Sequence, residues 1–471
     1  MKSPDVILGA WEKTLTRKSD AAAILGPKGN TLRTFDEIEK RAHDFAHQID
    51  SIQPGDVLAV QIGNHEDWPS ILIAVLRKQV VVLPLEQSIS DQQRDIALEI
   101  CGATGLLTQP ADSLSPTFSQ SERRFLLSSG EKMRMRGISL LKLTSGTTGT
   151  PRAIQFRSEQ LLADCEQICD TMGITDVDLN FGVIPMSHSY GFSNLLTPLL
   201  VRGVPMAVSR DRTPRAVLVD LARTGATVFP GMPLFYQAFC EMERVPDLTN
   251  LRLCISAGAP LSIAIAKNFR GKFGLSIHSF YGASECGGIC YDHDGTSDAE
   301  GFVGQPMKNV VLEILDRAAP SSQIRVRSAA AGDGYFPGQE KTKLGHGVFI
   351  PDDLLARDGA GFRIVGRVSD VINVAGKKVN PAEVETHLLR FKGVRQAVVF
   401  GRPAAAGALR NEEVAACVVA DVDVRENDLL EFCRSGLSGW QVPKRIFIVG
   451  ELPVNQRGKI SRRELALRFL P

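Results

Sequence analysis

One decapeptide of the 471-residue chain carries most of the information about its fold: Leu143-Thr144-Ser145-Gly146-Thr147-Thr148-Gly149-Thr150-Pro151-Arg152. From Thr144 to Thr150, every residue is a glycine or carries a hydroxyl group. Backbone N–H groups and hydroxyls can approach an anion closely in such a loop, and Arg152 can add a bidentate contact. The sequence therefore favours a phosphate-binding loop after a strand at residues 138–143, with a surface turn as the alternative. It lacks the Walker pattern that a P-loop kinase needs.

Short apolar runs alternate with amphipathic segments around this loop. Residues 35–49 have apolar side chains at helical spacing, and Thr34 with Glu37 has the signature of a capping box. Residues 56–62 and 80–85 are predicted strands, with a predicted helix between them. This alternation predicts a large, multi-layer α/β domain with a mostly parallel sheet.

The pattern changes near Gly366. Strand-like and helix-like segments then follow in mixed order, at residues 371–374, 381–390, 397–400, 415–419, 427–437, 446–449 and from 461 onward. This order predicts a separate, small α+β domain of about 100 residues. We place the two domains at residues 1–368 and 369–471.

Composition and charge exclude several classes of protein. Hydrophobic residues make up 44% and charged residues 23%, as in ordinary globular chains. The 54 basic and 53 acidic residues give a net charge of +1, so no electrostatic footprint for nucleic acid is present. No apolar run reaches the roughly 18–20 residues of a membrane helix. The nine scattered cysteines favour a reducing, cytoplasmic setting over a disulfide framework.

The decapeptide resembles the signature T-S-G-T-T-G-x-P-K-G of the adenylate-forming superfamily, which includes acyl-CoA synthetases, luciferases and nonribosomal-peptide adenylation domains. Arg152 and Ala153 stand where that signature has lysine and glycine. Further motifs follow in the family's order, and the resemblance extends over residues 35–465. It implies that this loop binds the phosphates of ATP through Thr144, Ser145, Gly146, Thr147, Thr148, Gly149 and Arg152.

Three of the further motifs lie in the large domain. Residues 185–192 resemble the segment beside the acyl pocket, where His188 would border the carboxylate. Residues 256–261 resemble the adenine-side loop, which implies nucleotide binding by Ala257, Gly258, Ala259 and Pro260. Residues 281–285 resemble Y-G-x-T-E, which adds Tyr281, Gly282, Ala283 and Ser284 to the nucleotide site. In that motif Glu285 would bind Mg²⁺, and Thr144 is the second predicted metal ligand.

The remaining motifs lead into the small domain. Residues 351–354 take the place of T-G-D-L, where Asp353 would bind the ribose hydroxyls and Asp352 is the alternative by alignment. In the following Gly366–Asp370 stretch, Arg367 would contact ribose or phosphate, and Ser369 occupies the family's hinge position.

Two more positions complete the predicted site. Gly376 resembles the region that lines the pantetheine tunnel in thioester-forming members. Residues 453–460 resemble the P-x-x-x-x-G-K-[IL] loop, in which Lys459 would reach the reacting carboxylate and the α-phosphate. The predicted catalytic set is therefore Lys459, Glu285, His188 and Arg367.

The resemblance implies an enzyme that uses ATP, Mg²⁺ and CoA. It would join a carboxylic acid to AMP and then transfer the acyl group to a thiol, as an AMP-forming acyl-CoA synthetase does. Residues 186–190 hold no acid to pair with an amino-acid ammonium, so amino acids are disfavoured. Small residues at 286–288 admit a larger apolar acyl group. We therefore expect a medium- or long-chain fatty acid or an aromatic acid as substrate.

Several alternatives stay open. An acyl-AMP ligase would load the phosphopantetheine of an acyl carrier protein, and a luciferase-like oxygenase shares the motifs. A catalytically impaired homologue acting as a binding module is the third, because Arg152, Pro351 and Ser369 depart from the family pattern. The expected partners are the small-molecule acid, ATP and CoA, without nucleic acid or integral membrane association. A homodimer is left open.

Overall fold

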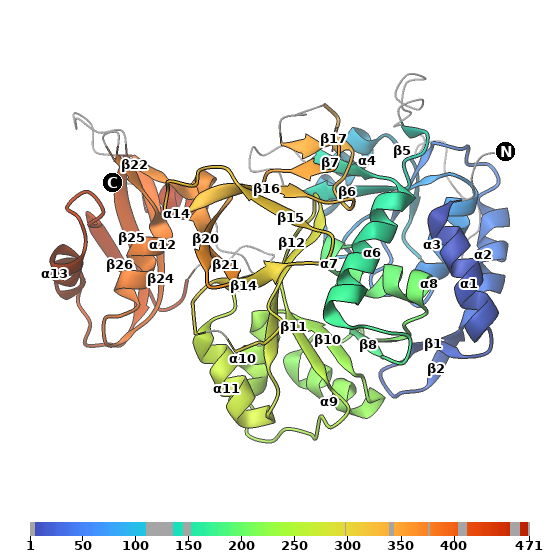
Figure 1. Ribbon diagram of the computed structural model, residues 1–471, viewed down its shortest axis with the longest axis horizontal. Coiled ribbons are helices and arrows are strands. Elements are labelled where there is room, and N and C mark those ends of the chain that lie inside the picture. The colour runs from blue at the N-terminus through green and yellow to red at the C-terminus, as the bar shows by residue number, and fades with distance from the viewer. Residues whose placement is uncertain are drawn as a thin grey trace. The chain divides into compact units, whose positions relative to one another are not determined.

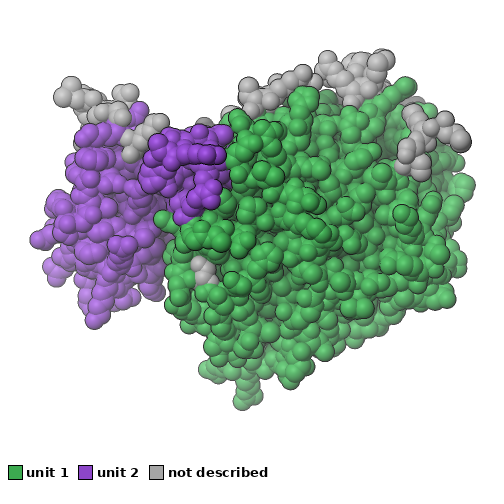
Figure 2. Space-filling view, in the orientation of Figure 1, with its two compact units in different colours: residues 1–313, 325–351, 358–363 green, residues 314–324, 352–357, 364–471 purple. Residues whose placement is uncertain are grey.

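The computed structural model describes residues 5–109, 135–144, 152–296, 298–338, 343–374, 377–403, 412–452 and 462–469. Contacts divide the chain into two compact units, which Figure 2 colours separately. Unit 1 comprises residues 1–313, 325–351 and 358–363, and unit 2 comprises residues 314–324, 352–357 and 364–471. The division into domains at residues 1–368 and 369–471 remains a prediction.

A six-stranded sheet forms one layer of unit 1 (Figure 1). Its order is β17-β7-β6-β4-β3-β5. Strands β6, β4, β3 and β5 run parallel, and β7 is antiparallel to both of its neighbours, β6 and β17. Every residue of β3 and β4 is buried, as is typical of parallel strands covered on both faces. The strands are β3 (Val57–Val60), β4 (Val81–Pro84), β5 (Ala103–Leu107), β6 (Leu140–Thr144), β7 (Arg152–Phe156) and β17 (Gly334–Phe336).

A second sheet of unit 1 runs in the order β2-β1-β9-β8-β10-β11-β12-β13-β14. The six strands from β1 to β12 in this order are parallel, and the remaining pairs are antiparallel. The strands are β1 (Ala22–Leu25), β2 (Thr31–Thr34), β8 (Asn180–Gly182), β9 (Met206–Val208), β10 (Val228–Gly231), β11 (Leu253–Ser256), β12 (Ile277–Ala283), β13 (Gly287–Tyr291) and β14 (Phe302–Pro306).

The helices of unit 1 alternate with these strands, as the sequence predicts. Thr34 and Glu37 form the predicted capping box, with hydrogen bonds of 3.2 and 2.8 Å to each other's backbone N–H groups. Helices α1, α2 and α3 pack together (Figure 1). The helices are α1 (Val6–Lys18), α2 (Phe35–Gln48), α3 (Trp68–Arg77), α4 (Asp91–Cys101), α6 (Ser158–Met172), α7 (Ser189–Gly191), η2 (Phe192–Leu196), α8 (Thr197–Arg202), α9 (Pro214–Thr224), α10 (Pro233–Glu241) and α11 (Ile263–Phe273).

Several short strands lie between residues 311 and 367. Of these, β15, β16, β20 and β21 contain residues of both units, so neither unit is continuous in sequence. The strands are β15 (Val311–Ile314), β16 (Ser322–Arg327), β18 (Leu344–Gly345), β19 (Val348–Phe349), β20 (Asp353–Asp358) and β21 (Gly361–Arg367).

Unit 2 has the predicted α+β order. In its three-stranded sheet, β24 and β25 are antiparallel, β25 and β26 are parallel, and the core beneath it includes Val399, Ala416, Leu429 and Ile446. The elements are η3 (Val368–Asp370), β22 (Ile372–Val374), β23 (Lys377–Val379), α12 (Pro381–Leu388), β24 (Val394–Pro403), β25 (Glu412–Ala420), α13 (Glu426–Gly436), β26 (Arg445–Ile448) and α14 (Arg462–Arg468).

These elements confirm the predicted fold class, a large α/β unit followed by a small α+β unit. Among the described residues, no helix has both the length and the apolar composition needed to cross a bilayer. All nine cysteines are free thiols, and eight of them are buried.

Candidate active site

The predicted phosphate loop closes the hairpin of β6 and β7. Thr144 lies opposite Arg152 in the antiparallel register, and its hydroxyl donates to the Arg152 carbonyl at 3.3 Å. Strand pairing therefore brings together the first and last predicted nucleotide-binding residues of the loop. The loop itself, with Ser145, Gly146, Thr147, Thr148 and Gly149, lies outside the described residues.

Glu285 lies beside this hairpin. Strand β17 pairs with β7, and from β17 the Tyr335 hydroxyl donates to Glu285 Oε1 at 3.2 Å. The Arg152 guanidinium lies 5.9 Å from the centre of the Tyr335 ring, within cation–π range. We call Arg152, Glu285 and Tyr335 the Glu285 centre. The sequence did not single out Tyr335, because it belongs to none of the family motifs.

The donor set at the Glu285 centre fits Mg²⁺. A carboxylate oxygen is the hard ligand that this ion prefers, and Mg²⁺ at nucleotide sites typically uses one or two carboxylates together with the substrate's phosphates. Across the described ranges, no three His, Cys, Asp or Glu side chains gather into a metal cage. A single glutamate beside the β6–β7 hairpin is thus compatible with magnesium nucleotide binding, whereas a cage built only from protein groups is not found among the described residues.

Three predicted motifs follow the carboxyl ends of parallel strands in one sheet. Residues 185–192 follow β8, residues 256–261 follow β11, and residues 281–285 lie at the end of β12. The carboxyl edge of a parallel sheet is where open α/β folds bind ligands. The Ser189 hydroxyl donates to Ser284 Oγ at 3.0 Å, so the first and third motifs are in direct contact.

His188 caps the short helix α7. Its Nδ1 accepts a hydrogen bond from the Tyr190 backbone N–H at 3.2 Å. Since Nδ1 is the acceptor, the neutral imidazole carries its proton on Nε2. The arrangement therefore leaves His188 with one ring N–H donor, at the nitrogen away from the helix.

Asn64 fixes the segment that leads to His188. Its side-chain amide donates to the carbonyls of Gly182 and Ile184 at 3.0 and 2.9 Å, and its oxygen accepts from Met186 N–H at 2.8 Å. The side chain is buried, and these three bonds satisfy backbone groups between β8 and the motif. No sequence pattern marks this role, because the partners lie more than 100 residues away.

Aromatic residues near the motif of residues 185–192 have different environments. The Tyr190 hydroxyl donates to the Gly231 carbonyl at 3.2 Å, and burial raises the pKa of this phenol. Tyr236 is fully buried, and its ring lies within 5.5 Å of Phe229. Phe235 contacts the same ring at 6.1 Å. Phe235 and Tyr236 therefore belong to an aromatic core cluster around Phe229.

The adenine-side motif leaves β11 through a turn. Ala257 N–H donates to the Gly231 carbonyl at 3.3 Å, and Gly258 has φ +83°, a conformation that favours glycine. Ala259 and Pro260 follow in this turn. Tyr281 lies opposite Cys290 in the register of β12 and β13, and Gly282 and Ala283 end β12. The structure thus places all three motif loops at the same edge of the second sheet.

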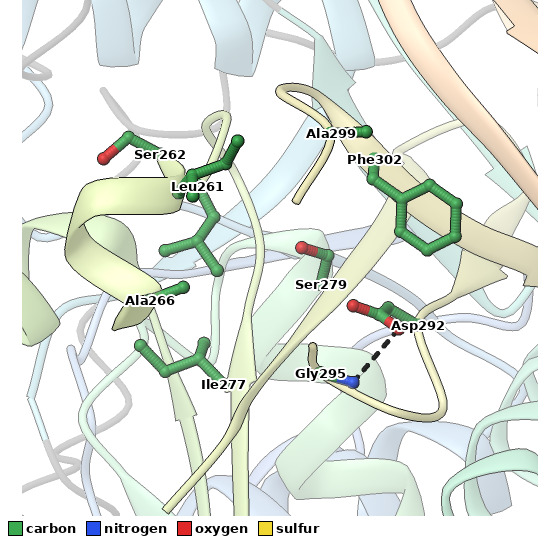
Figure 3. A pocket seen from close by; sticks show the side chains of 10 residues that line it. Leu261, Ser262, Ala266, Ile277, Ser279, Asp292, Gly295, Ala299 and Phe302 are labelled. Carbon is green, nitrogen blue, oxygen red and sulfur yellow. Dashed lines mark hydrogen bonds between the residues drawn. The ribbon is translucent and has the colours of Figure 1, made fainter. Parts of the chain in front are cut away.

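A small pocket lies next to these motifs (Figure 3). Leu261, the last residue of the adenine-side motif, and Phe302 both line it. Two further lining residues are bonded to each other, since Asp292 accepts a hydrogen bond from Gly295 N–H at 3.1 Å. The other lining residues are Ser262, Ile263, Ala266, Ile277, Ser279 and Ala299. None of the predicted nucleotide-binding residues lines this pocket.

In unit 2, two predicted ribose-side residues contact each other. Arg367 Nε donates to Asp353 Oδ1 at 2.8 Å, and the side chains are 62% and 13% exposed. The Val368 N–H donates to the Asp352 carbonyl at 2.8 Å, so Asp352 contributes its backbone to the same corner. The carboxylate of Asp353 thus forms an ion pair with Arg367.

Arg462 organises a second polar cluster in unit 2. It begins α14, and it contacts Asp370 Oδ2 at 2.6 Å, Glu385 Oε1 at 2.8 Å and the Val399 carbonyl at 2.9 Å. Asp370 directly follows the predicted hinge position, Ser369, whose backbone lies in η3. Gly376 and Lys459 lie outside the described residues.

Comparisons with known proteins cover nearly the whole chain. The family model described as AMP-binding enzyme matches residues 11–336, and that of the AMP-binding enzyme C-terminal domain matches residues 383–459. A feruloyl-CoA synthase from Amycolatopsis sp is 27% identical over a gapped alignment of 494 positions, and this alignment covers 98% of this chain and 99% of that protein. An oxalate–CoA ligase from Arabidopsis thaliana is 25% identical over 518 residues, with 99% of both chains covered.

A solved structure has the same fold. The ATP-bound crystal structure of MatB from Rhodopseudomonas palustris superposes with a TM-score of 0.83 and covers 98% of each chain, at 22% sequence identity. This likeness confirms the architecture that the sequence motifs predicted.

Proposed function

Because the chain belongs to the AMP-binding enzyme family, in its acid–thiol ligase branch, we propose that it converts a fatty acid or an aromatic carboxylic acid to its CoA thioester through an acyl adenylate. The observation that carries this proposal is the Glu285 centre. There a hard carboxylate, the end of the phosphate-loop hairpin and Arg152 come together in unit 1.

The first half-reaction needs charge stabilisation more than covalent chemistry by the protein. A carboxylate oxygen of the acid attacks the α-phosphorus of ATP, and the bond to the bridging oxygen breaks to release pyrophosphate. Thr144, Arg152 and the loop between them would hold the β- and γ-phosphates. Mg²⁺, held by Glu285 with Thr144 as the second ligand, would neutralise phosphate charge.

His188 would orient the attacking carboxylate. Its Nε2–H is a donor, because Nδ1 is engaged with the backbone of α7. A neutral donor beside the carboxylate holds it in place without forming a strong ion pair, which would stabilise the ground state as much as the transition state. Holding the two reactants in line can lower the barrier substantially, since it removes the entropy cost of their encounter.

Unit 2 would supply the remaining groups. Asp353 would accept hydrogen bonds from the two ribose hydroxyls, and Arg367 would contact ribose or phosphate. Lys459 would bring positive charge to the α-phosphate and the attacking carboxylate. In the second half-reaction, a thiolate attacks the acyl carbon, AMP leaves, and the segment around Gly376 would line the path of the pantetheine arm.

Two alternatives concern the acceptor and the activity. The thiol could belong to a carrier-protein phosphopantetheine instead of CoA, and a catalytically impaired homologue would bind nucleotide without turnover. The relative named feruloyl-CoA synthase acts on an aromatic acid, and the one named oxalate–CoA ligase acts on a small dicarboxylic acid. The named relatives support CoA as the acceptor, while their acids differ widely.

One assay tests the proposal. Acid-dependent exchange of labelled pyrophosphate into ATP is measured over a panel of aromatic acids, fatty acids of increasing length and oxalate, followed by AMP release with and without CoA. We expect exchange with at least one aromatic or fatty acid, and CoA-dependent AMP release with the same acid. Exchange with no acid would refute the proposal and favour the binding module.

The variant Lys459→Ala separates the two steps. It should abolish exchange, because the positive charge at the α-phosphate is removed, yet form thioester from supplied acyl adenylate at a rate near that of wild type. Equal loss of both steps would contradict the role given to Lys459. If AMP release required a phosphopantetheinylated carrier protein and did not respond to CoA, the acceptor would be the carrier protein and CoA would be excluded.

A further inference from the structure

Lys142 is a charged residue within a buried strand. It occupies the centre of β6 with only 5% of its surface exposed. Its Nζ lies 4.7 Å from the ring centre of Phe156 and 5.7 Å from that of Phe192. Within the part of the chain that the structure describes, no hydrogen bond or ion pair to Nζ is found. Aromatic faces compensate a buried ammonium only in part, so the charge needs a nearby anion.

Asp164 is a buried anion on the neighbouring helix α6. It is 4% exposed, its Oδ2 accepts from the Ser193 hydroxyl at 2.5 Å, and its Oδ1 accepts from Gly288 N–H at 3.0 Å. The carboxylate fits tightly against Gly287, where an added Cβ would lie 1.9 Å from Oδ1. Asp164 therefore fastens η2 to the first residues of β13.

The two charges share one buried region. Phe192, which faces the Lys142 ammonium, directly precedes Ser193, which donates to Asp164. Burial lowers the pKa of Lys142, and the negative charge of Asp164 opposes this more than that of Glu285 does. Among the described residues no ion pair joins Lys142 to Asp164, so the two charges act on each other only through the low-dielectric interior, where charges act over longer distances than in water.

The positions of these residues connect two catalytic segments. Lys142 is two residues before Thr144, and Asp164 binds the backbone of Gly288, three residues after Glu285. We propose that Lys142 and Asp164 form a buried charge pair that positions the Glu285 segment relative to the phosphate-loop hairpin, so that both are positioning residues for adenylate formation. This inference rests on the proposed function, since it assigns Glu285 to that step.

A double-mutant cycle tests the pair. Lys142→Met removes the ammonium at similar volume, Asp164→Asn removes the negative charge while keeping the acceptor for Gly288, and the double variant removes both charges. We expect exchange to fall at least about tenfold for Lys142→Met, because the aspartate is left buried without its counter-charge. The double variant should recover most of this loss, with a coupling of about tenfold or more.

A second measurement separates positioning from stability. Thioester formation from supplied acyl adenylate should change less than about threefold in Lys142→Met, because that step does not need the magnesium-bound phosphates at Glu285. The kcat of exchange should fall while the KM of the acid changes little. Equal losses in both half-reactions, or losses that simply multiply in the double variant, would overturn the inference.

A matched pair elsewhere in unit 1 serves as the control. Arg252 contacts the buried Asp178 at 2.7 Å, outside all of the motifs. Arg252→Met with Asp178→Asn should lower the urea midpoint of unfolding without a selective loss of exchange. For each variant, the loss of exchange is compared with the loss of unfolding stability. If this ratio were the same in the control as in Lys142→Met, the positioning role would be refuted.

Failure of the proposed function can be distinguished from failure of this inference. Binding of ATP with Mg²⁺, measured by calorimetry, requires no knowledge of the acid. Lys142→Met should weaken it at least about tenfold, and the double variant should restore most of the affinity. If wild type shows no exchange with any acid but this binding cycle holds, the proposed reaction fails and the charge pair stands. If wild type exchanges normally but the binding cycle is additive, the charge pair fails.

Discussion

Two carboxylates are assigned to the nucleotide, and the molecule holds them in different ways. Glu285 in unit 1 is contacted by Tyr335 from β17, a strand in register with the phosphate-loop hairpin. Asp353 in unit 2 is held by Arg367, whose side chain is 62% exposed. Strand register positions the first group, whereas an ion pair open to solvent contributes only about 0–1 kcal/mol to the second. The surroundings of Glu285 are therefore set by strand pairing, whereas those of Asp353 are set by an exposed ion pair.

The largest expected effect comes from Glu285→Gln. The amide can still accept from the Tyr335 hydroxyl, so the geometry should persist while the negative charge is lost. We expect exchange to fall roughly 10²–10³-fold, as when one preorganised electrostatic group is removed from an active site. Raising the Mg²⁺ concentration should recover part of the rate.

Tyr335→Phe is the control for this substitution. It removes one hydrogen bond and leaves the carboxylate, so the loss of exchange should stay within about tenfold. A loss as large as that of Glu285→Gln would mean that the tyrosine itself is essential, and the role of the carboxylate would have to be revised.

The next effect concerns stability in unit 1. Burial alone would raise the pKa of Asp178, but hydrogen bonds from Arg252, Thr175 and Thr227 outweigh it and lower the pKa. A lowered carboxyl pKa stabilises the fold above the unfolded value of about 3.9, and this stability is lost as the pH falls below it. Asp178→Asn should therefore cost about 1–3 kcal/mol at pH 7, measured by urea unfolding.

The acid side of the titration is the check. Between pH 5 and pH 3, the difference in unfolding free energy between wild type and Asp178→Asn should shrink. A difference that stays constant with pH would show that packing, and not the charge of Asp178, accounts for the loss.

A smaller effect is expected from Asp353→Asn in unit 2. The variant loses a charge-assisted acceptor for the ribose hydroxyls, so the KM for ATP should rise about tenfold. The stability should change by less than about 1 kcal/mol, because the pair with Arg367 is exposed. Unchanged kinetics with ATP and 2′-deoxy-ATP alike would remove Asp353 from the site.

The smallest effect is expected from Ser369→Pro, at the predicted hinge. Proline fixes φ near −65°, so a change of backbone angle at this position becomes costly. Thioester formation should slow several-fold more than adenylate formation, measured as single-turnover rates of the two steps. Equal rates for wild type and variant would place the hinge elsewhere.

The sequence predicted those parts of the site that depend on local pattern. The sequence predicts the motifs because each consists of a few adjacent residues. The same holds in the fold for the capping box of Thr34 and Glu37. Tyr335 and Asn64 were missed because their partners are 50 and 122 residues away and no spacing rule connects them. Lys142 did leave a signal, a lysine within the apolar run Leu140–Leu143, but only the structure shows that Phe192, which it faces, adjoins the residue bonded to Asp164.

Arg462 joins three elements of unit 2. Its contacts with Asp370, Glu385 and Val399 join the start of α14, helix α12 and strand β24 into one body. Arg363, in turn, pairs with Phe302 of β14 and belongs to unit 1. A rotation of this body against Arg363 would therefore be absorbed in the residues between Arg363 and Asp370, the stretch that holds the predicted hinge position Ser369.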